Sequence, residues 1–333
     1  MAPAVLSAIA GVNKGPALAY GADAATDRVE SLMSALFDSD VDTLFAFNGT
    51  GANVLALGCL LEAGDSVLCV DTAHIHTDEA AAPERVLGTK IVTVPGVDGK
   101  LTVDSIRSCV TDTAEVHHPR VGVVSISQVT EMGTVYSPAE VRALADAAHS
   151  VGLRLHMDGA RIANAVAAKG GDTETLRAMT VGAGVDALSF GATKNGGMYG
   201  EAVVLFSPTG KKNHKYLRKQ YTQLPSKMRY VSAQFEALLS DNLWLDLASH
   251  ANTMAAQLFE ATSMHQDLNL TAPQANSLFP TMRADAATAL SAWSFFWPWR
   301  PELSQYRWMT SWETTPDDVA RFAEGITRVL QGA

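Results

Sequence analysis

Short apolar runs rich in β-branched residues alternate with longer segments of helical periodicity from residue 43 to residue 206. This alternation is typical of a mostly parallel β-sheet covered by helices. The runs predict strands over residues 43–47, 66–70, 90–94, 121–126, 153–157, 185–190 and 201–206. We therefore expect an α/β fold with a mostly parallel mixed sheet.

One helix start is marked by neighbouring residues that suit the first turn of a helix. Ser137 provides an N-cap, Pro138 fits the first helical position, and Glu140 completes a capping box. The apolar periodicity that follows ends near Gly152. The sequence therefore predicts a crossover helix over residues 138–150.

The pattern changes after Phe206, where long helical stretches cover residues 230–240 and 243–264. The remaining residues combine short strands with a terminal helix that starts near Thr315-Pro316-Asp317-Asp318. We predict a large domain over residues 1–245, with an N-terminal arm over about residues 1–18, and a smaller α+β domain over residues 246–333.

The charge balance argues against a nucleic-acid partner. The 333 residues carry a formal net charge of −10, and 47% of them are hydrophobic, which suits a chain with a large core. The one dense basic stretch, from Lys211 to Lys219, is interpreted as the solvated face of a helix.

The cysteines and the absence of a long apolar run bear on location. Cys59, Cys69 and Cys109 are odd in number, lack CxxC spacing and lie among apolar residues, so we expect reduced core thiols. No apolar run approaches the roughly 20 residues that span a bilayer. These features predict a cytoplasmic protein without a membrane partner.

Ligands of an open parallel sheet bind just beyond the carboxyl ends of its strands. The first such place is the segment Gly49-Thr50-Gly51, which follows a strand and leads into a helix expected to begin near Asn53. Backbone N–H groups of glycines and a helix N-terminus suit a phosphate group. A purely structural glycine turn explains the segment equally well, because it lacks P-loop and GxGxxG spacing.

Three more strand ends carry candidate chemistry. Asp158 and Arg161 follow the strand 153–157, although an aspartate there also serves as an ordinary N-cap. Lys194 stands among small residues after the next strand, where a desolvated amine becomes a nucleophile toward carbonyls. His74 follows the strand 66–70 and is either a ring-stacking or proton-moving group or simply exposed.

Taken together, these residues indicate one kind of ligand more specifically than any one of them does alone. Pyridoxal phosphate requires an anion site, a carboxylate for its pyridinium nitrogen and an amine for its aldehyde. The glycine turn, Asp158 and Lys194 supply these three contacts. A nicotinamide dehydrogenase is disfavoured, because no GxGxxG with a following acidic residue is present.

The chain resembles the low-specificity L-threonine aldolases, which belong to the β-eliminating lyase group of the aspartate-aminotransferase-like, fold-type I pyridoxal-phosphate enzymes. The resemblance runs from about residue 17 to the C-terminus. The segments that carry it are residues 19–23, 49–53, 73–75, 78–79, 98–102, 128–136, 156–161, 189–196, 226–229 and 307–312. It implies cleavage of L-threonine, L-allo-threonine and related 3-hydroxy amino acids such as phenylserine to glycine and an aldehyde.

The resemblance also implies roles for residues around the cofactor. Lys194 would form the Schiff base with pyridoxal phosphate, Asp158 would pair with its ring nitrogen, and His74 would stack on its ring. Gly49 and Thr50 would bind the phosphate. No metal ion is expected.

Further implied roles concern the substrate and the subunit interface. Arg161 and Arg307 would bind the substrate carboxylate, and Tyr20 is a further substrate-binding candidate. Lys227 and Arg229 match the basic residues that reach the phosphate from a neighbouring subunit. A homodimer or homotetramer with active sites at the dimer interface is therefore expected.

Three questions stay open at this point. The base for the β-hydroxyl is either His74 or a water held by His74 and Glu79. Family members usually carry a Ser-Asp-Asn segment before the stretch that matches residues 2–6, and its serine is expected to help bind the carboxylate. Without that segment a catalytically impaired cofactor-binding homologue is an alternative, as is a β-eliminating lyase on the same scaffold.

Overall fold

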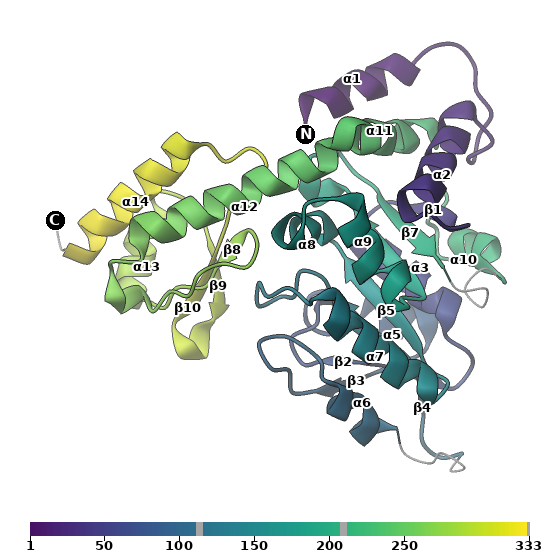
Figure 1. Cartoon of the computed structure of the whole chain (residues 1–333), viewed down its shortest axis with the longest axis horizontal. Coiled ribbons are helices and arrows are strands. Elements are labelled where there is room, and N and C mark those ends of the chain that lie inside the picture. Colours follow the sequence, from purple (N-terminus) through teal and green to yellow (C-terminus); the bar gives the residue numbers. More distant parts are fainter. Residues whose placement is uncertain (111–115, 207–211, 332–333) are drawn as a thin grey trace.

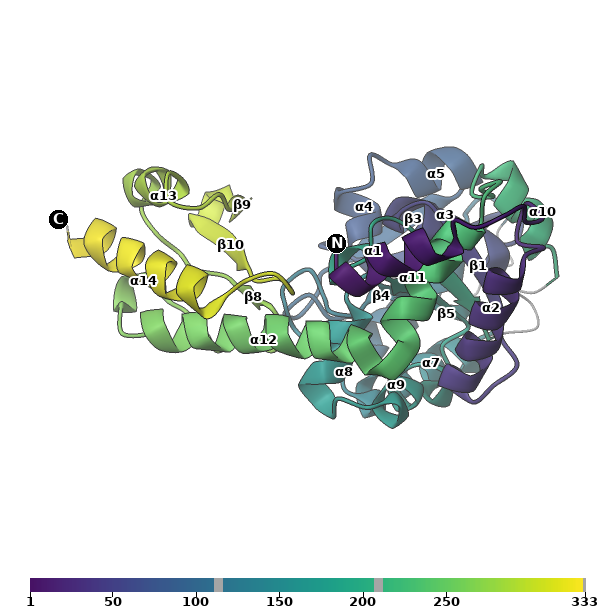
Figure 2. The same cartoon turned by 90° about the horizontal axis from the view of Figure 1, so that it is seen from above.

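The computed structural model describes residues 1–110, 116–206 and 212–331. A seven-stranded sheet with helices on both faces forms the larger part, and a three-stranded sheet with two helices forms the smaller part (Figures 1 and 2). The long helix α12 (Leu243–Thr262) runs from one part to the other. The C-terminus lies at the far end of the smaller part (Figure 1).

The large sheet has the strand order β1-β7-β6-β5-β4-β2-β3. Within it β7 runs antiparallel to β1 and β6, and the other neighbouring pairs are parallel, which confirms the predicted mostly parallel mixed sheet. Its strands are β1 (Asp42–Ala46), β2 (Asp65–Val70), β3 (Lys90–Val94), β4 (Arg120–Ser127), β5 (Arg154–Gly159), β6 (Ala187–Gly191) and β7 (Glu201–Leu205). Each of the seven predicted strands is confirmed, with its ends shifted by at most two residues.

The helices of the larger part connect and cover these strands. They are α1 (Pro3–Val12), α2 (Ala24–Phe37), α3 (Gly49–Leu60), α4 (His74–Thr77), α5 (Ala82–Leu87), α6 (Val103–Cys109), α7 (Pro138–Ser150), α8 (Ile162–Lys169), α9 (Thr173–Met179), α10 (His214–Gln220) and α11 (Arg229–Leu239). Short 3₁₀ turns lie between some of them, including η1 (Val181–Ala183), η2 (Thr193–Asn195) and η3 (Ser240–Asn242). The helical stretches predicted after residue 230 are confirmed as α11 and α12.

The predicted crossover helix is confirmed as α7, with its capping box formed. Glu140 N donates to Ser137 Oγ over 3.2 Å, and Ser137 N donates to Glu140 Oε2 over 2.6 Å. These two bonds satisfy backbone N–H groups that the first turn of a helix leaves free.

The expected start of α3 near Asn53 was wrong, because the helix begins at Gly49. Asn48 is the N-cap, and its side chain accepts a hydrogen bond from Gly51 N over 2.8 Å. That cap compensates the poor helix propensity of the two glycines. The glycine segment is therefore the first helical turn rather than a loop before it.

The smaller part is built around a second apolar cluster. Its sheet has the order β8-β10-β9 and consists of β8 (Ser277–Leu278), β9 (Trp297–Arg300) and β10 (Gln305–Met309), accompanied by η4 (Gln266–Leu268), η5 (Pro301–Leu303), α13 (Ala284–Ser291) and α14 (Pro316–Gln331). Along α12, Leu245 belongs to the core around the large sheet, whereas Met254 and Leu258 belong to the second core. The domain boundary after residue 245 stays a prediction.

Several predictions from composition can be compared with the structure. Cys59 and Cys69 are buried free thiols, and Cys109 is a partly buried one. In the basic stretch, Lys215 and Lys219 are exposed on α10, and Lys211 lies outside the described residues. None of the helices described is both long enough and apolar enough to cross a membrane.

We expect Ser137→Ala to lower the free energy of unfolding by about 1 kcal/mol, because the N-cap bond of α7 is lost. The matched control is Ser150→Ala, since Ser150 lies at the other end of α7 and its hydroxyl bonds only to Ala147 O. Urea denaturation of both variants measures the difference. Equal stabilities would contradict the cap assignment.

Candidate active site

The site lies where the carboxyl ends of β4, β5 and β6 come together. Ser127 is the register partner of Asp158, and Asp158 is the register partner of Ser189, so these strands end at one edge of the sheet. A cavity of about 410 Å³ opens there, with β9 and β10 of the smaller part closing it. The sequence-predicted residues that line it are Gly49, His74, Glu79, Asp158, Arg161, Lys194 and Arg307.

Asp158 is a buried carboxylate at the end of β5. Its Oδ2 accepts a hydrogen bond from Asn53 Nδ2 over 2.8 Å, and its Oδ1 accepts one from Ala160 N over 2.9 Å. Burial opposes ionisation, but the charge of Lys194 and these two hydrogen bonds outweigh it and lower the pKa of Asp158. The residue is therefore an anion inside the protein.

Lys194 lies in η2, directly after β6. Burial lowers the pKa of its amine, and the charge of Arg161 lowers it further. Gly191 is required before it, because any Cβ there would overlap the backbone of Ala160. The lowered pKa makes the Lys194 amine more easily deprotonated than that of an ordinary lysine.

A buried glutamate on β7 fixes the turn that carries Lys194. Glu201 Oε2 accepts a hydrogen bond from Ala192 N over 2.5 Å. Burial raises the pKa of Glu201 to about 6. The contact holds the backbone two residues before the lysine.

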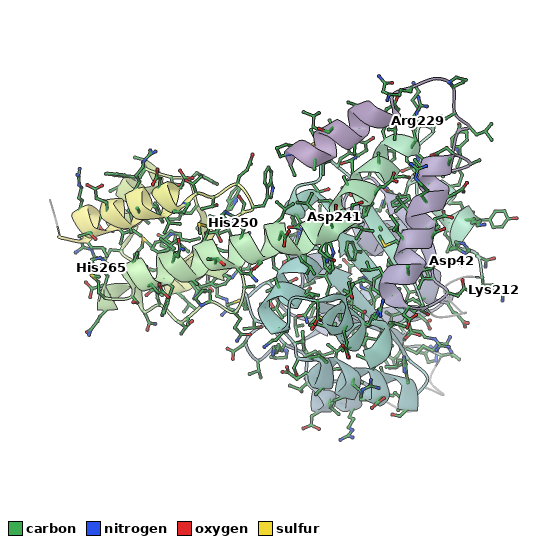
Figure 3. All side chains as sticks on the ribbon, turned by 45° about the horizontal axis from the view of Figure 1, so that its top comes forward. Asp42, Lys212, Arg229, Asp241, His250 and His265 are labelled. Atoms are coloured by element: carbon green, nitrogen blue, oxygen red, sulfur yellow. The ribbon has the colours of Figure 1, made fainter. Side chains whose placement is uncertain are left out.

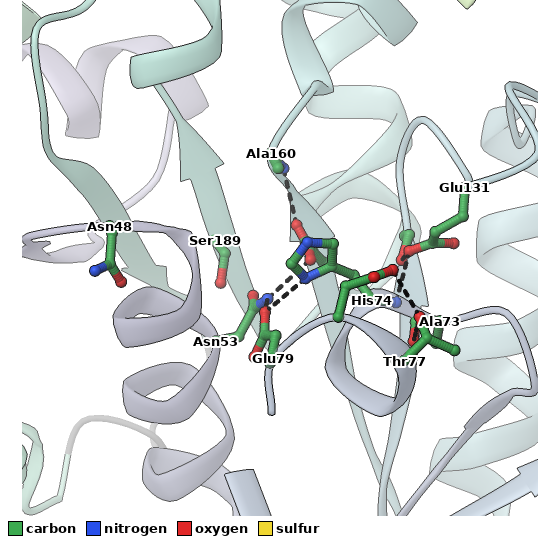
Figure 4. A network of polar contacts seen from close by, with 12 residues as sticks. Asn48, Asn53, Ala73, His74, Thr77, Glu79, Glu131, Ala160 and Ser189 are labelled. Carbon is green, nitrogen blue, oxygen red and sulfur yellow. Dashed lines mark hydrogen bonds and ion pairs between the residues drawn. The ribbon is translucent and has the colours of Figure 1, made fainter. Parts of the chain in front are cut away.

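His74 begins α4 and is linked to Glu79 and Asn53, as Figure 4 shows. His74 Nδ1 and Glu79 Oε1 are 2.9 Å apart, and the same oxygen accepts from Asn53 Nδ2 over 2.9 Å. The hydrogen bond to Glu79 raises the pKa of His74 although burial opposes it. Among the described residues the Nε2 atom of His74 has no hydrogen-bond partner, so it is available to a ligand.

Two arginines reach the cavity from different parts of the chain. Arg161 precedes α8, and Arg307 lies on β10 with its guanidinium 4.2 Å from the centre of the Trp299 ring. Burial and the charge of Arg307 lower the pKa of Arg161 to about 10, and burial lowers that of Arg307. Neither guanidinium forms an ion pair within residues 1–110, 116–206 and 212–331, so both are available to an anionic ligand.

Sequence reasoning missed two polar residues of the site, Asn53 and Glu131. Both lie in the matched segments, but neither received a role. Glu131 Oε1 accepts hydrogen bonds from His74 N over 2.9 Å and from Ser127 Oγ over 2.6 Å, and burial raises its pKa. Their contacts join residues far apart in sequence, so no local pattern identifies them.

Other predicted residues lie outside the lining of this cavity. Thr50 is on the first turn of α3, and Lys227 is an exposed residue before α11. Arg229 begins α11 near α1 and α2 (Figure 3), and its Nη1 donates to Gly15 O over 3.1 Å. Tyr20 is exposed, with Lys219 Nζ 5.3 Å from its ring centre. Their roles stay predictions.

The residues present fit pyridoxal phosphate. An amine with a lowered pKa and an ionised carboxylate line one cavity, as the aldehyde and the ring nitrogen require. Gly49 places the N-terminus of α3 at the same cavity, and a helix N-terminus suits a phosphate group. No Cβ atom at Gly49 would meet another group within 4 Å, so there is room for an anion there.

The architecture and the site define an α/β enzyme with the aspartate-aminotransferase-like fold, which confirms the predicted fold class. The aspartate aminotransferase of Thermus thermophilus matches with a TM-score of 0.69 at 16% identity, covering 98% of this chain and 86% of that one. Residues 1–285 match the family described as beta-eliminating lyase, and the chain belongs to this family.

Within this family, the chain is similar to several threonine aldolases. The chain is 40% identical over 335 residues to the low specificity L-threonine aldolase of Pseudomonas aeruginosa, covering 99% of this chain and 95% of that protein. The low specificity L-threonine aldolase of a Pseudomonas species is 40% identical over 332 residues, covering 98% of this chain and 94% of that protein. The solved threonine aldolase of Leishmania major matches with a TM-score of 0.91 at 31% identity, covering 99% of this chain and 96% of that one.

Replacing Glu79 by Gln keeps the shape of the side chain and removes the charge beside His74 Nδ1. We expect the pKa of His74 to fall, because the hydrogen bond that raises it is weakened. NMR titration of the imidazole Cε1 proton measures the change. A wild-type pKa in Glu79→Gln would contradict the pairing.

The pair of His74 and Glu79 also makes the free energy of unfolding depend on pH. The folded-state pKa of His74 lies above its unfolded value, so the pair stabilises fully below the unfolded pKa and less as the pH rises through the folded pKa. Wild type and Glu79→Gln should therefore differ more in urea unfolding at about pH 5.5 than at about pH 8.5.

Proposed function

We propose that this chain cleaves L-threonine, L-allo-threonine and related 3-hydroxy amino acids to glycine and an aldehyde, with pyridoxal phosphate as its cofactor. The observation that carries the proposal is one cavity lined by the Lys194 amine, a buried carboxylate and two arginines without an ion pair among the described residues. The relatives with 40% identity over nearly the whole chain support it.

Arg161 and Arg307 bind the carboxylate of the amino acid. The substrate carboxylate accepts charge-assisted hydrogen bonds from both guanidinium groups, which have no ion-pair partner among the described residues. Trp299 lies against the Arg307 guanidinium and limits its orientations. The substrate is thus held at one end, which sets the direction of its Cα–Cβ bond.

Lys194, Asp158, Gly49 and His74 hold the cofactor. Pyridoxal phosphate, when bound, supplies an aldehyde for amines and a ring that takes up the electron pair of a breaking Cα–Cβ bond. Lys194 provides the resident amine, and its lowered pKa favours the neutral form that reacts. Asp158 stays ionised and keeps a proton on the ring nitrogen by charge pairing.

His74 takes the proton of the β-hydroxyl, directly or through one water. Its Nδ1 is paired with Glu79, which leaves Nε2 for the substrate side. Glu79 has no exposed side-chain surface, whereas the His74 side chain is 36% exposed. Glu79 therefore orients the imidazole of His74, and the imidazole contacts the substrate.

The chain acts as a homodimer or homotetramer in the cytoplasm. Lys227, exposed before α11, and Arg229 lie outside the cavity of their own chain, as expected of residues that serve the phosphate site of a neighbour. Light scattering tests this: a fully active monomer would rule out the roles proposed for both residues.

We expect Lys194→Ala to lose the cofactor absorbance band that depends on the covalent link, and to lose threonine cleavage, because the resident amine is absent. The control is Lys169→Ala, an exposed lysine at the end of α8. Glycine with acetaldehyde, measured against pyruvate, distinguishes aldol cleavage from β-elimination. Cleavage that persists in Lys194→Ala would refute the proposal.

Arg307→Met should raise KM for threonine by roughly tenfold or more, because a hydrogen bond to a charged group is lost. The effect on cofactor affinity should be small, since Asp158 and Lys194 are retained. Arg283→Met is the control, because Arg283 is exposed and pairs with Asp285. Steady-state kinetics of both variants measure the difference, and an unchanged KM in Arg307→Met would exclude carboxylate binding by this residue.

A further inference from the structure

Asn53 lies on α3, one turn after Gly49, and is only 1% exposed. Its Nδ2 donates to Asp158 Oδ2 over 2.8 Å and to Glu79 Oε1 over 2.9 Å. Its Oδ1 is buried and has no hydrogen-bond partner among the described residues. One amide group therefore serves two buried carboxylates (Figure 4).

Two carboxylates that approach each other in a buried site normally share a proton, because their charges repel. Here ligand atoms of His74, Glu79 and Asp158 all lie within 4.8 Å of one another, a spacing that a metal ion would also fit. Here the Asn53 amide donates a hydrogen bond to each carboxylate instead. An amide donates without adding charge.

We propose that Asn53 is a positioning residue that bridges the carboxylates of Glu79 and Asp158, and so couples the orientation of His74 to the carboxylate that meets the cofactor ring. The proposal rests on the proposed function for what His74 and Asp158 do. The chain of contacts runs from His74 Nδ1 through Glu79 Oε1 and Asn53 Nδ2 to Asp158 Oδ2.

Other charged groups also act on the two carboxylates that Asn53 contacts. The charge of Lys194 lowers the pKa of Asp158. Burial lowers the pKa of Arg161, and the charge of Asp158 partly opposes that effect. The titratable and charged groups that face the two carboxylates come from several elements: His74 on α4, Glu131 after β4, His156 on β5, Arg161 before α8 and Lys194 in η2. All of these side chains are retained when Asn53 is replaced, so the tests below change only the amide.

The first test is the affinity for pyridoxal phosphate as a function of pH. In Asn53→Leu, Asp158 loses one donor and should gain its proton at a higher pH than in wild type. Relative to wild type at the same pH, we expect about tenfold weaker binding at mildly acidic pH and a smaller loss above neutrality. Comparison at equal pH cancels the titration of the cofactor itself.

The second test is the pKa of His74 in the cofactor-free protein, measured by NMR. Glu79 loses a donor in Asn53→Leu and binds the imidazolium more strongly, so the His74 pKa should rise. Asn53→Asp keeps the shape and adds a charge, so it should raise that pKa further. Because Asn53→Asp is isosteric, it decides the question if Asn53→Leu does not fold.

Asn276→Leu is the matched control. Asn276 is also buried, its Nδ2 donates to Thr310 O over 2.8 Å, and its Oδ1 has no partner among the described residues. It bonds to no carboxylate, so neither readout should change. Wild-type cofactor affinity and a wild-type His74 pKa in both Asn53 variants would overturn the inference. Failure of wild type to cleave threonine would instead overturn the proposed function, since neither readout measures turnover.

Discussion

The site depends on one buried negative charge, the carboxylate of Asp158. A carboxylate taken out of water normally gains a proton, and only specific partners prevent this. Here the partners are the Ala160 N–H, the Asn53 amide and the charge of Lys194. They come from the segment after β5, from α3 and from η2, so the assembled sheet is needed to stabilise this charge once it is buried. The parallel register of β4, β5 and β6 brings these groups to one edge.

The spacing of the two arginines proposed to bind the substrate depends on a second arrangement, the packing of the smaller part against the larger one. Arg161 belongs to the larger part, and Arg307 belongs to β10 of the smaller. Between α8 and α12, Asn164 Nδ2 donates to Asn252 Oδ1 over 3.1 Å, and Asn252 Nδ2 donates to Asn164 O over 2.9 Å. This reciprocal pair joins a helix of the larger part to the long helix that leads into the smaller part.

Much of the fold follows from local features of the sequence. The seven strands are apolar runs bounded by turns, and α7 starts at a capping box, so periodicity and end signals suffice. The start of α3 was misplaced because glycine has low helix propensity, whereas the Asn48 cap stabilises the helix from outside it. Residues that directly follow strands, such as Asp158 and Lys194, were found for the same local reason.

Residues whose role depends on contacts between distant parts of the chain could not be predicted from the sequence. Asn53 resembles any polar position on a helix until its contacts with Glu79 and Asp158 are known. What the sequence does not show is an energy: a hydrogen-bond donor between two buried carboxylates stabilises most where water is excluded. The same logic explains the arginines, whose lowered pKa values reflect burial without a counter-ion. Asp158 thus has partners within the protein, whereas Arg161 and Arg307 form no ion pair among the described residues. This difference supports the proposal that the cavity binds an amino acid through its carboxylate.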